Sequence, residues 1–283
     1  MIAQAWPFAA ATALLVLVAL LVHTRVRGFL PEDPPGLGRK RHARPTPMLG
    51  AAPAVVAVTC CALSDAPLLA VAVGLAAVTG LVDDLRKSRG HDGLDWRAKA
   101  LGLGLAALSS ALALDPALRI ALPTLALILA LFCLVNAFNF LDNQDGVSTS
   151  LGVVALGFVA WRDDAALCAS LCATWLAFLP FNWPRPRAFL GDSGAYALGA
   201  CAASLALRPQ GDGHGEWLAT LAPVAVPTLD FAQVVCVRLV LGYAPWKGDR
   251  RHLTHLLLLL GVPAVALAPL LASAALAIAL LSS

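Results

Sequence analysis

The sequence predicts an all-α, polytopic integral membrane protein. The chain of 283 residues is 59% hydrophobic and only 13% charged, whereas a soluble domain carries about 25% charged residues. Apolar stretches that can cross a bilayer recur along the whole chain, and short polar connections separate them. The polar motifs gather in the connections on one side. We therefore expect about ten transmembrane helices in a single domain over residues 1–283.

Each expected span is a stretch of about 20 apolar residues, or fewer where flanking polar groups reach the interface. The first has no charged segment before it and no small-residue cleavage site, so we expect it to be retained and not removed as a signal peptide. The sixth is short, and the last contains Pro263 and Pro269, either of which can kink it. The ranges are 6–23, 48–64, 66–82, 98–114, 117–136, 148–161, 165–181, 190–206, 217–238 and 256–280.

The basic residues fix the expected orientation. Seventeen of the 20 fall in alternate connections, and only Arg119, Arg162 and Arg208 lie on the other side. By the positive-inside rule the basic connections are cytoplasmic, which places both termini outside and the polar motifs below on the cytoplasmic face. The seventeen are Arg25, Arg27, Arg39, Lys40, Arg41, Arg44, Arg86, Lys87, Arg89, Arg97, Lys99, Arg185, Arg187, Arg238, Lys247, Arg250 and Arg251.

The most informative polar segment follows the fifth expected span. Asn136, Asn139, Asp142 and Asp145 come at a fixed step of three. A step of three drifts about 60° around an α-helix, so the four share one line only if the last turn tightens toward a 3₁₀ helix. Gly146 can then supply the left-handed cap that ends the helix. Two carboxylates beside amides suit a divalent cation, a nucleobase or a ribose; the alternative is a solvated helix end.

Adjacent acids, Asp83 and Asp84, end the third expected span. Burying a charge toward the bilayer centre costs about 2.5–3.5 kcal/mol on insertion scales. Neighbouring like charges also raise the pKa of one member, which is one way to make a general base or a metal-bound pair. Two solvated carboxylates are the simpler alternative. Lys99, at the start of the next span, is by itself a lysine that reaches to the interface.

A second polar motif connects the seventh and eighth spans. Asn182 ends the seventh, and Asp192 opens the eighth. The backbone N–H groups at a helix N-terminus favour an anion there, although an Asp that only caps the helix is a strong alternative. Phe189 is placed either to stack on a base or to anchor in the interface.

Two basic connections suit phosphate. The first contains Arg41 and Thr46, next to prolines that fix an extended turn, and the last places up to four donors in six residues, which suits a diphosphate. Both also serve as orientation signals that touch anionic lipid. The donors in the last connection are Arg250, Arg251, His252 and His255. Asp230, within the ninth span, needs a partner, and we expect Arg238 or a polar group on a neighbouring helix.

These blocks together resemble the polyprenyl-phosphate N-acetylhexosamine-1-phosphate transferases, glycosyltransferase family 4. The resemblance runs from about Arg39 to His255, and every block is present in order. The blocks are Arg-His-Ala-Arg-Pro-Thr-Pro, Asp83-Asp84, Asn136-x-x-Asn139-x-x-Asp142-x-x-Asp145-Gly146, Asn182 with Gly191-Asp192-Ser193-Gly194, and Asp249-Arg250-Arg251-His252-x-x-His255.

The resemblance implies a reaction in cell-envelope glycan synthesis at the plasma membrane. N-acetylhexosamine-1-phosphate, with a GlcNAc-type sugar favoured, passes from a UDP-sugar to polyprenyl phosphate such as undecaprenyl phosphate, and UMP is released. The implied cofactor is Mg²⁺ or Mn²⁺. The implied partners are UDP-N-acetylhexosamine, polyprenyl phosphate, membrane lipid and a second copy of the chain, with no nucleic acid.

The resemblance also implies roles for single residues. Asp83 is the candidate base, Asp192 the first metal ligand with Asp142 as a further one, and Asp84 and Lys99 complete the catalytic group. A two-step mechanism with a covalent Asp stays open. The implied substrate contacts are Arg41, Thr46, Asn136, Asn139, Asp142, Asp145, Asn182, Phe189, Arg250, Arg251, His252 and His255.

Two positions depart from the family pattern, and they bear on the sugar more than on the reaction. Asn143 stands where the family usually has Gly, and Thr254 stands where it commonly has His. The alternative class is a transporter or flippase of a lipid-linked or anionic substrate, with Asp230 as its coupling carboxylate. Such a protein should line a path through the bilayer with polar groups and carry inverted repeats, whereas the acids here gather on one face.

Overall fold

The computed structural model describes residues 2–26, 29–33, 45–116, 121–163, 165–208, 220–246 and 248–283. Within these ranges a helix lies over each of the ten expected spans. The helices are α1 (Ile2–Arg25), α2 (Ala51–Leu63), α3 (Pro67–Ser88), α4 (Trp96–Leu114), α5 (Leu122–Leu141), α6 (Val147–Asp163), α7 (Ala166–Asn182), α8 (Gly191–Ala206), the 3₁₀ helix η1 (Ala222–Val224), α10 (Ala225–Val240), α11 (Leu253–Leu259) and α12 (Ala264–Leu281).

The protein is a polytopic membrane protein. In the described part of the chain, six helices are long and apolar enough to cross a bilayer, namely Ala5–Arg25, Pro67–Ser88, Trp96–Leu114, Leu122–Leu141, Ala222–Val240 and Ala264–Leu281. Two shorter apolar helices, Ala51–Leu63 and Ala166–Asn182, accompany them. The count of ten spans and the orientation in the membrane stay predictions.

Three local expectations are corrected. The last expected span is two helices, because α11 ends at Leu259 and Pro263 is the N-cap of α12. The fold also contains a two-stranded antiparallel sheet of β1 (Glu32–Asp33) and β2 (Thr46–Pro47). Finally, α5 ends at Leu141 and not at Gly146, although Gly146 does adopt a left-handed φ of +72° just before α6.

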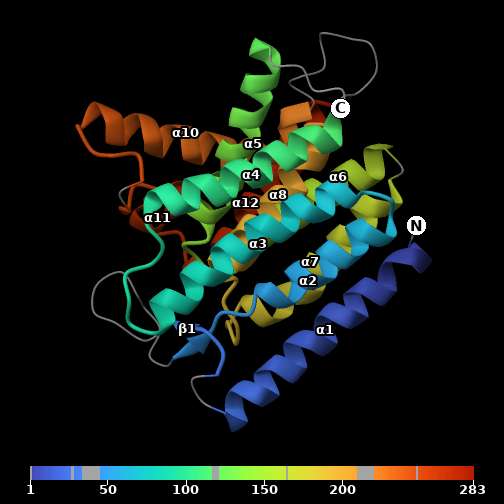
Figure 1. Ribbon diagram of the computed structural model, residues 1–283. Coiled ribbons are helices and arrows are strands. Elements are labelled where there is room, and N and C mark those ends of the chain that lie inside the picture. Colours follow the sequence, from blue (N-terminus) through green and yellow to red (C-terminus); the bar gives the residue numbers. More distant parts are fainter. Residues whose placement is uncertain are drawn as a thin grey trace.

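Helix α3 lies at the centre of the bundle and packs against α8, α4 and α2 (Figure 1). Its contact with α8 depends on Gly80. A Cβ at this position would lie 2.3 Å from the Asp192 carbonyl carbon and 2.4 Å from the Ser193 nitrogen. The two backbones therefore meet directly, which brings the end of α3 against the beginning of α8.

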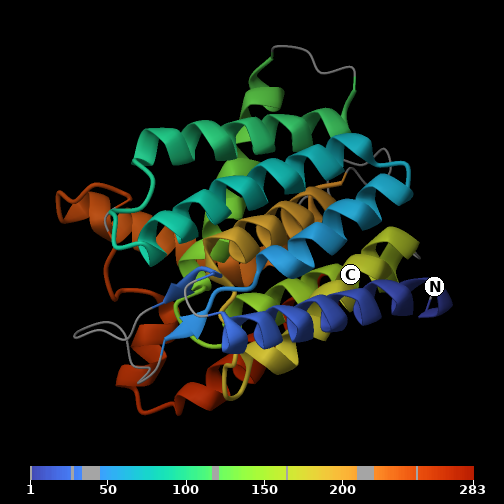
Figure 2. The same cartoon turned by 60° about the horizontal axis from the view of Figure 1, so that its bottom comes forward.

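The two ends of the bundle differ. Both chain termini lie at one end, and β1, the end of α3 and the beginning of α4 lie at the other (Figure 1). The same division is visible after rotation, and α10 projects from the end that carries the sheet (Figure 2). The polar motifs of the sequence converge at that end.

Candidate active site

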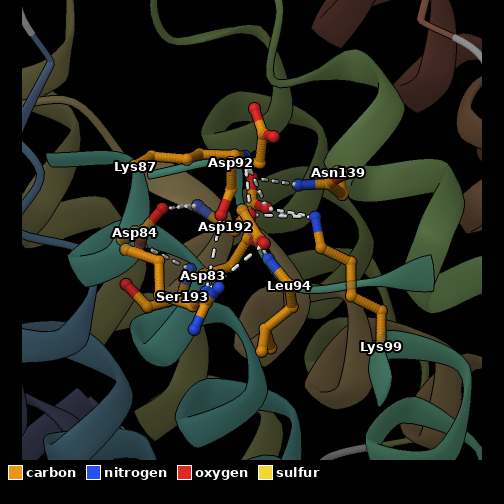
Figure 3. Close-up of polar contacts among 11 residues, drawn as sticks. Asp83, Asp84, Lys87, Asp92, Leu94, Lys99, Asn139, Asp192 and Ser193 are labelled. Atoms are coloured by element: carbon orange, nitrogen blue, oxygen red, sulfur yellow. Dashed lines mark hydrogen bonds and ion pairs between the residues drawn. The ribbon is translucent and has the colours of Figure 1, made fainter. Parts of the chain in front are cut away.

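Asp192 is the centre of the candidate active site. Its Oδ2 lies 3.1 Å from the Nζ of Lys87 and 3.3 Å from the Nζ of Lys99. Its Oδ1 accepts a 3.0 Å hydrogen bond from the Asn139 side chain. These partners come from α3, α4 and α5, and their side chains converge on Asp192 (Figure 3). Four helices thus position one carboxylate.

Asp83 joins the same lysines from the buried side. Its Oδ2 lies 2.6 Å from Lys87 and 2.8 Å from Lys99, and Oδ1 accepts a hydrogen bond from the Leu94 amide. The Asp83 side chain is fully buried, whereas Lys99 is 24% and Lys87 46% exposed. Two buried or half-buried carboxylates therefore share two ammonium groups at the surface of the site. This pairing offsets charges that would otherwise be costly to bury.

Asp84 points to a different partner. Its Oδ1 accepts from the Asp192 backbone N–H at 3.0 Å, and its Oδ2 accepts from the Ser193 N–H at 3.0 Å. Asp84 thus satisfies free N–H groups at the start of α8, where a negative charge is favourable. The sequence suggested that Asp192 could itself cap α8. Instead the cap comes from α3, and the Asp192 side chain is left for the lysines.

The turn after α5 brings a further acid close to Asp192. Asp142 is the half-buried C-cap of α5, and Asp145 lies exposed in the turn. Burial, together with the negative charges of Asp192, Asp84 and Asp145, raises the pKa of Asp142 well above its usual range, although a hydrogen bond from the Gly191 amide opposes the shift. Asn139 alone of the two helical amides reaches the cluster, because the Asn136 amide donates to the Phe132 carbonyl one turn back at 2.8 Å.

Asn182 holds the connection between α7 and α8. Its buried side chain accepts from the Thr149 hydroxyl at 2.9 Å and donates to the Ala188 carbonyl at 3.1 Å. Phe189 and Thr46 belong to a neighbouring extended pairing, in which the Phe189 N–H donates to the Pro47 carbonyl at 2.9 Å. The backbone hydrogen bonds of these residues hold the chain segment that leads into α8 and Asp192. Their predicted contact with substrate stays a prediction.

Residues 249–255, which we call the Arg-His segment, are held in place by ion pairs of Asp249. Asp249 binds Arg238 at 3.1 Å and Arg251 at 3.0 Å. Partial burial alone would raise the pKa of Asp249, but hydrogen bonds from the two arginines lower it to about 2. Arg250 is exposed, and His255 is half-buried with its ring 6.1 Å from that of His252. Arg41 lies outside the described residues.

Of the two partners expected for Asp230, Arg238 and a polar group on a neighbouring helix, the structure shows the second. Its Oδ2 lies 2.9 Å from His252 Nδ1, and its Oδ1 accepts from the Leu253 N–H at 2.6 Å. Both carboxylate oxygens of Asp230 are therefore engaged by the residues that begin α11. It belongs to the same end of the molecule as the other polar motifs.

Sequence reasoning missed Lys87 as a member of the site and missed the contact between Asn143 and Thr254. Lys87 was counted only as an orientation signal, although its place four residues after Asp83 on one helix face predicts an ion pair. The two departures from the family pattern are in contact, since the Thr254 hydroxyl donates to the Asn143 side-chain oxygen at 2.6 Å. No signal in the sequence could join two residues 111 positions apart.

The donor set is compatible with a magnesium ion completed by substrate. Among the described residues no three His, Cys, Asp or Glu side chains form a metal cage. Mg²⁺, however, is usually held by one or two carboxylates together with substrate phosphates and water. Asp192 and Asp142 supply two carboxylates, and the pKa of Asp142 is raised first by burial and then by the charge of Asp192, both of which a bound cation would offset.

Acids and lysines that converge at one end of a membrane helix bundle define a membrane enzyme for phosphate-bearing substrates, because such a site can neutralise transferring anions. Comparison with known proteins makes this class specific. The pattern of glycosyl transferase family 4 matches residues 66–210, about half of the chain and all of α3 to α8. The chain belongs to this family.

Several relatives have names that refer to a polyprenyl phosphate and to N-acetylglucosamine. A decaprenyl-phosphate N-acetylglucosaminephosphotransferase of Mycolicibacterium smegmatis is 27% identical over 79% of this chain and 68% of its own length. The Mycobacterium tuberculosis protein of the same name is 32% identical over 52% of this chain and 43% of its own. An undecaprenyl-phosphate alpha-N-acetylglucosaminyl 1-phosphate transferase of Escherichia coli is 30% identical over 47% of this chain and 40% of its own.

Proposed function

We propose that this protein transfers GlcNAc-1-phosphate from UDP-GlcNAc to a polyprenyl phosphate, at the cytoplasmic face of the plasma membrane. An oxygen of the lipid phosphate bonds to the β-phosphorus of the nucleotide sugar. The bond from that phosphorus to the bridging oxygen breaks, and UMP leaves with the electron pair. The observation that carries the proposal is the convergence of Asp192, Asp83, Lys87 and Lys99 inside the segment that matches the family.

The lysines are the residues that we assign to the phosphates. Two anions must approach each other, so negative charge has to be neutralised before phosphorus and oxygen can meet. Lys87 and Lys99 sit between two carboxylates and are partly exposed, so each can turn from Asp192 to a phosphate oxygen. Lys99 is the more enclosed of the two. Its attraction to a phosphate should therefore be the stronger one, because less solvent screens the two charges.

Asp83 is our candidate for keeping the lipid phosphate fully ionised. It is buried at the base of the cluster and hydrogen-bonded to both lysines. A proton that it accepts from the phosphate would weaken these ion pairs and release the lysines. Asp84 binds only the start of α8 among the hydrogen bonds of the described residues, so we assign it to positioning Asp192 and not to the chemistry.

Asp192, with Asp142 beside it, would hold a divalent cation. When bound, Mg²⁺ polarises phosphoryl oxygens and neutralises the charge that develops on the leaving group. Asn139 would orient Asp192 through its 3.0 Å hydrogen bond. The predicted nucleotide contacts Asp145 and Phe189 flank this position in the chain, one in the turn after α5 and one just before α8.

The proposal is tested by measuring UMP release from purified protein in detergent. The assay contains undecaprenyl or decaprenyl phosphate, a panel of UDP-sugars, and Mg²⁺ with an EDTA control. We expect metal-dependent UMP from UDP-GlcNAc, and a loss of at least about 100-fold for Asp192→Asn, the size seen when one electrostatic group is removed from a transfer site. The matched control is Asp65→Asn, in the exposed turn between α2 and α3, where the left-handed φ of +53° also suits Asn.

Three results would each contradict part of the proposal. Folded wild-type protein that releases no UMP from any UDP-sugar would remove the transferase assignment. Full turnover by Asp192→Asn in Mg²⁺ would instead leave the reaction in place but remove the metal role of this residue. Uptake of substrate into proteoliposomes without UMP formation would favour the transporter alternative.

A further inference from the structure

The first turn of α11 is held by a buried carboxylate from another helix. Asp230, on α10, uses both of its oxygens: one lies 2.9 Å from His252 Nδ1, and the other accepts from the Leu253 N–H at 2.6 Å. The Asp230 side chain is fully buried, and that of His252 is only 7% exposed. A mid-helix carboxylate this buried is costly unless all its acceptors are engaged. The pair is therefore a built arrangement and not a chance contact of two surface groups.

This contact determines which ring nitrogen of His252 carries hydrogen. An ionised carboxylate can only accept, so Nδ1 must be the donor. Nε2 is then the nitrogen that remains for a ligand, and no hydrogen bond between described residues occupies it. Nε2 donates to an anionic ligand when both ring nitrogens carry hydrogen, and the Asp230 carboxylate is then the acceptor for the Nδ1–H group.

Other contacts keep the ring from turning. The Phe140 ring lies edge-on to His252 with 5.6 Å between centroids, and the His255 ring lies 6.1 Å away. The adjoining Thr254, fully buried, donates to Asn143 in the turn that also carries Asp142. The His252 turn is thus fixed to α10 on one side and to the acidic turn after α5 on the other.

We propose that Asp230 is a positioning residue for phosphate recognition, which orients His252 so that Nε2 donates to the diphosphate of the nucleotide sugar. The inference rests on the proposed function for the identity of that ligand. Asp230 itself touches no substrate. Its role is comparable to that of a carboxylate behind a metal-bound histidine, whose removal typically costs about 10–100-fold in affinity or activity.

The test uses Asp230→Asn and His252→Gln, singly and together, in the full-length protein. Asn keeps the shape of Asp230 and can still accept from Leu253, but its NH₂ group faces Nδ1, so Nδ1 must accept and the ring carries its single hydrogen on Nε2. Nε2 can then donate only as part of a neutral ring, which makes a weaker hydrogen bond to a phosphate than a charged ring does. We expect Asp230→Asn to raise the KM for UDP-GlcNAc about 10–100-fold with an unchanged KM for polyprenyl phosphate. When His252→Gln is already present, adding Asp230→Asn should raise the KM for UDP-GlcNAc by less than about threefold, because the effects of coupled residues are not additive.

Several kinetic outcomes would overturn the proposal. A further tenfold loss in the His252→Gln background would mean that Asp230 acts independently of the ring. An increase confined to the KM for polyprenyl phosphate would contradict the diphosphate assignment. A loss from Asp230→Asn that appears only in kcat, together with a lowered thermal midpoint, would show that Asp230 has a structural role only.

A spectroscopic arm decides the matter even if the protein turns over no UDP-sugar. Nitrogen-15 labelling of the six histidines allows the His252 signal to be assigned by its loss in His252→Gln. We expect Nδ1 of His252 to be protonated in the wild type, with and without UDP, and unprotonated in Asp230→Asn. An unprotonated Nδ1 in the wild type would refute the proposal, while absent turnover with the expected spectrum would refute only the proposed function.

Discussion

Two neighbouring acids, Asp83 and Asp84, have separate tasks in this site. Asp83 binds ammonium groups, whereas Asp84 binds the backbone N–H groups of Asp192 and Ser193. Residues next to each other on a helix point about 100° apart, so a pair of acids at a helix end can serve two different neighbours. The sequence motif shows two acids but not this division.

Replacing Asp84 by Asn should destabilise the start of α8. Asn has one acceptor oxygen, so one of the two N–H groups would face an NH₂ group, and the loss of a charged hydrogen bond costs about 1.5–3 kcal/mol. We expect a lower thermal midpoint in detergent together with lower turnover. Asp95→Asn is the matched control, because the exposed Asp95 accepts one backbone bond from Arg97 and Asn caps a helix as well as Asp. Equal midpoints for the two variants would contradict this role.

Acid should weaken the Arg-His segment through Asp249. Its pKa is about 2 in the folded protein and near its usual value of about 3.9 in the unfolded chain. A lowered pKa means that its stabilisation is complete above about pH 4 and is lost as the pH falls toward 2. The thermal midpoint of the wild type should therefore fall more steeply than that of Asp249→Asn between pH 4.5 and 3. Parallel curves would show that the two arginines do not stabilise the fold through this carboxylate.

The residues that sequence reasoning found are those with a short-range signal. Asp83, Asp192 and Asn139 lie near helix ends beside apolar spans, where a polar side chain is costly unless it has a partner. In the structure Asn139 bonds to Asp192, and Lys99 pairs with both Asp83 and Asp192. For Asp230 the sequence left two partners open, and the structure selects the polar group on a neighbouring helix, at the start of α11, and not Arg238. His252 lies 22 residues away beyond a loop, and no local pattern specifies such a contact.

At the scale of elements, the contact of α3 with α8 depends on Gly80. A methyl group there would lie within 2.4 Å of the Asp192 and Ser193 backbone, so Gly80→Ala must displace the start of α8 and with it Asp192. We expect at least a tenfold loss of UMP release, since a misplacement of about 1 Å can cost about 100-fold. Gly104→Ala, on α4, meets nothing within 4 Å and should be fully active. Normal activity of Gly80→Ala would mean that the two helices are not held this closely.

The Asn143–Thr254 contact should couple the acidic turn to α11. Thr254→Val removes the donor but keeps the shape, and leaves the Asn143 oxygen without its 2.6 Å partner. A double-mutant cycle with Asn143→Ala should give a coupling of about 1 kcal/mol in kcat/KM for UDP-GlcNAc. Thr228→Val should show no coupling with Asn143, because within the described residues the Thr228 hydroxyl bonds only to the Val224 carbonyl one turn back. Additive effects of Asn143→Ala and Thr254→Val would reduce the contact to local packing.

Helix positions were predictable because apolar length decides them, but helix ends were not. α5 stops at Leu141, where the turn of Asp142 and Asn143 begins, although the spacing of polar residues suggested one more helical turn. The break between α11 and α12 occurs before Pro263, which was one of the two expected kink positions. The strands β1 and β2 are two residues each, too short for a period-two pattern to reveal them.

For the whole molecule, the arrangement predicts how the protein lies in its membrane. The site and the termini are at opposite ends of the bundle, so both termini should face outward if the basic connections are cytoplasmic. Alkaline phosphatase fused after Ser283 should be active in cells, and green fluorescent protein at the same position should be dark. A fluorescent fusion with inactive phosphatase would reverse the orientation and place the site on the outer face, where no cytoplasmic nucleotide sugar could reach it.

The cap that Asp84 gives to α8 changes how the presence of each acid in other chains should be interpreted. Asp84 recognises main-chain groups, so a swap of side chain at Ser193 leaves its partners unchanged. Retention of the second acid in a distant homologue would therefore indicate that the contact between α3 and α8 is retained. A homologue that keeps the second acid but not the first should still build the junction between α3 and α8.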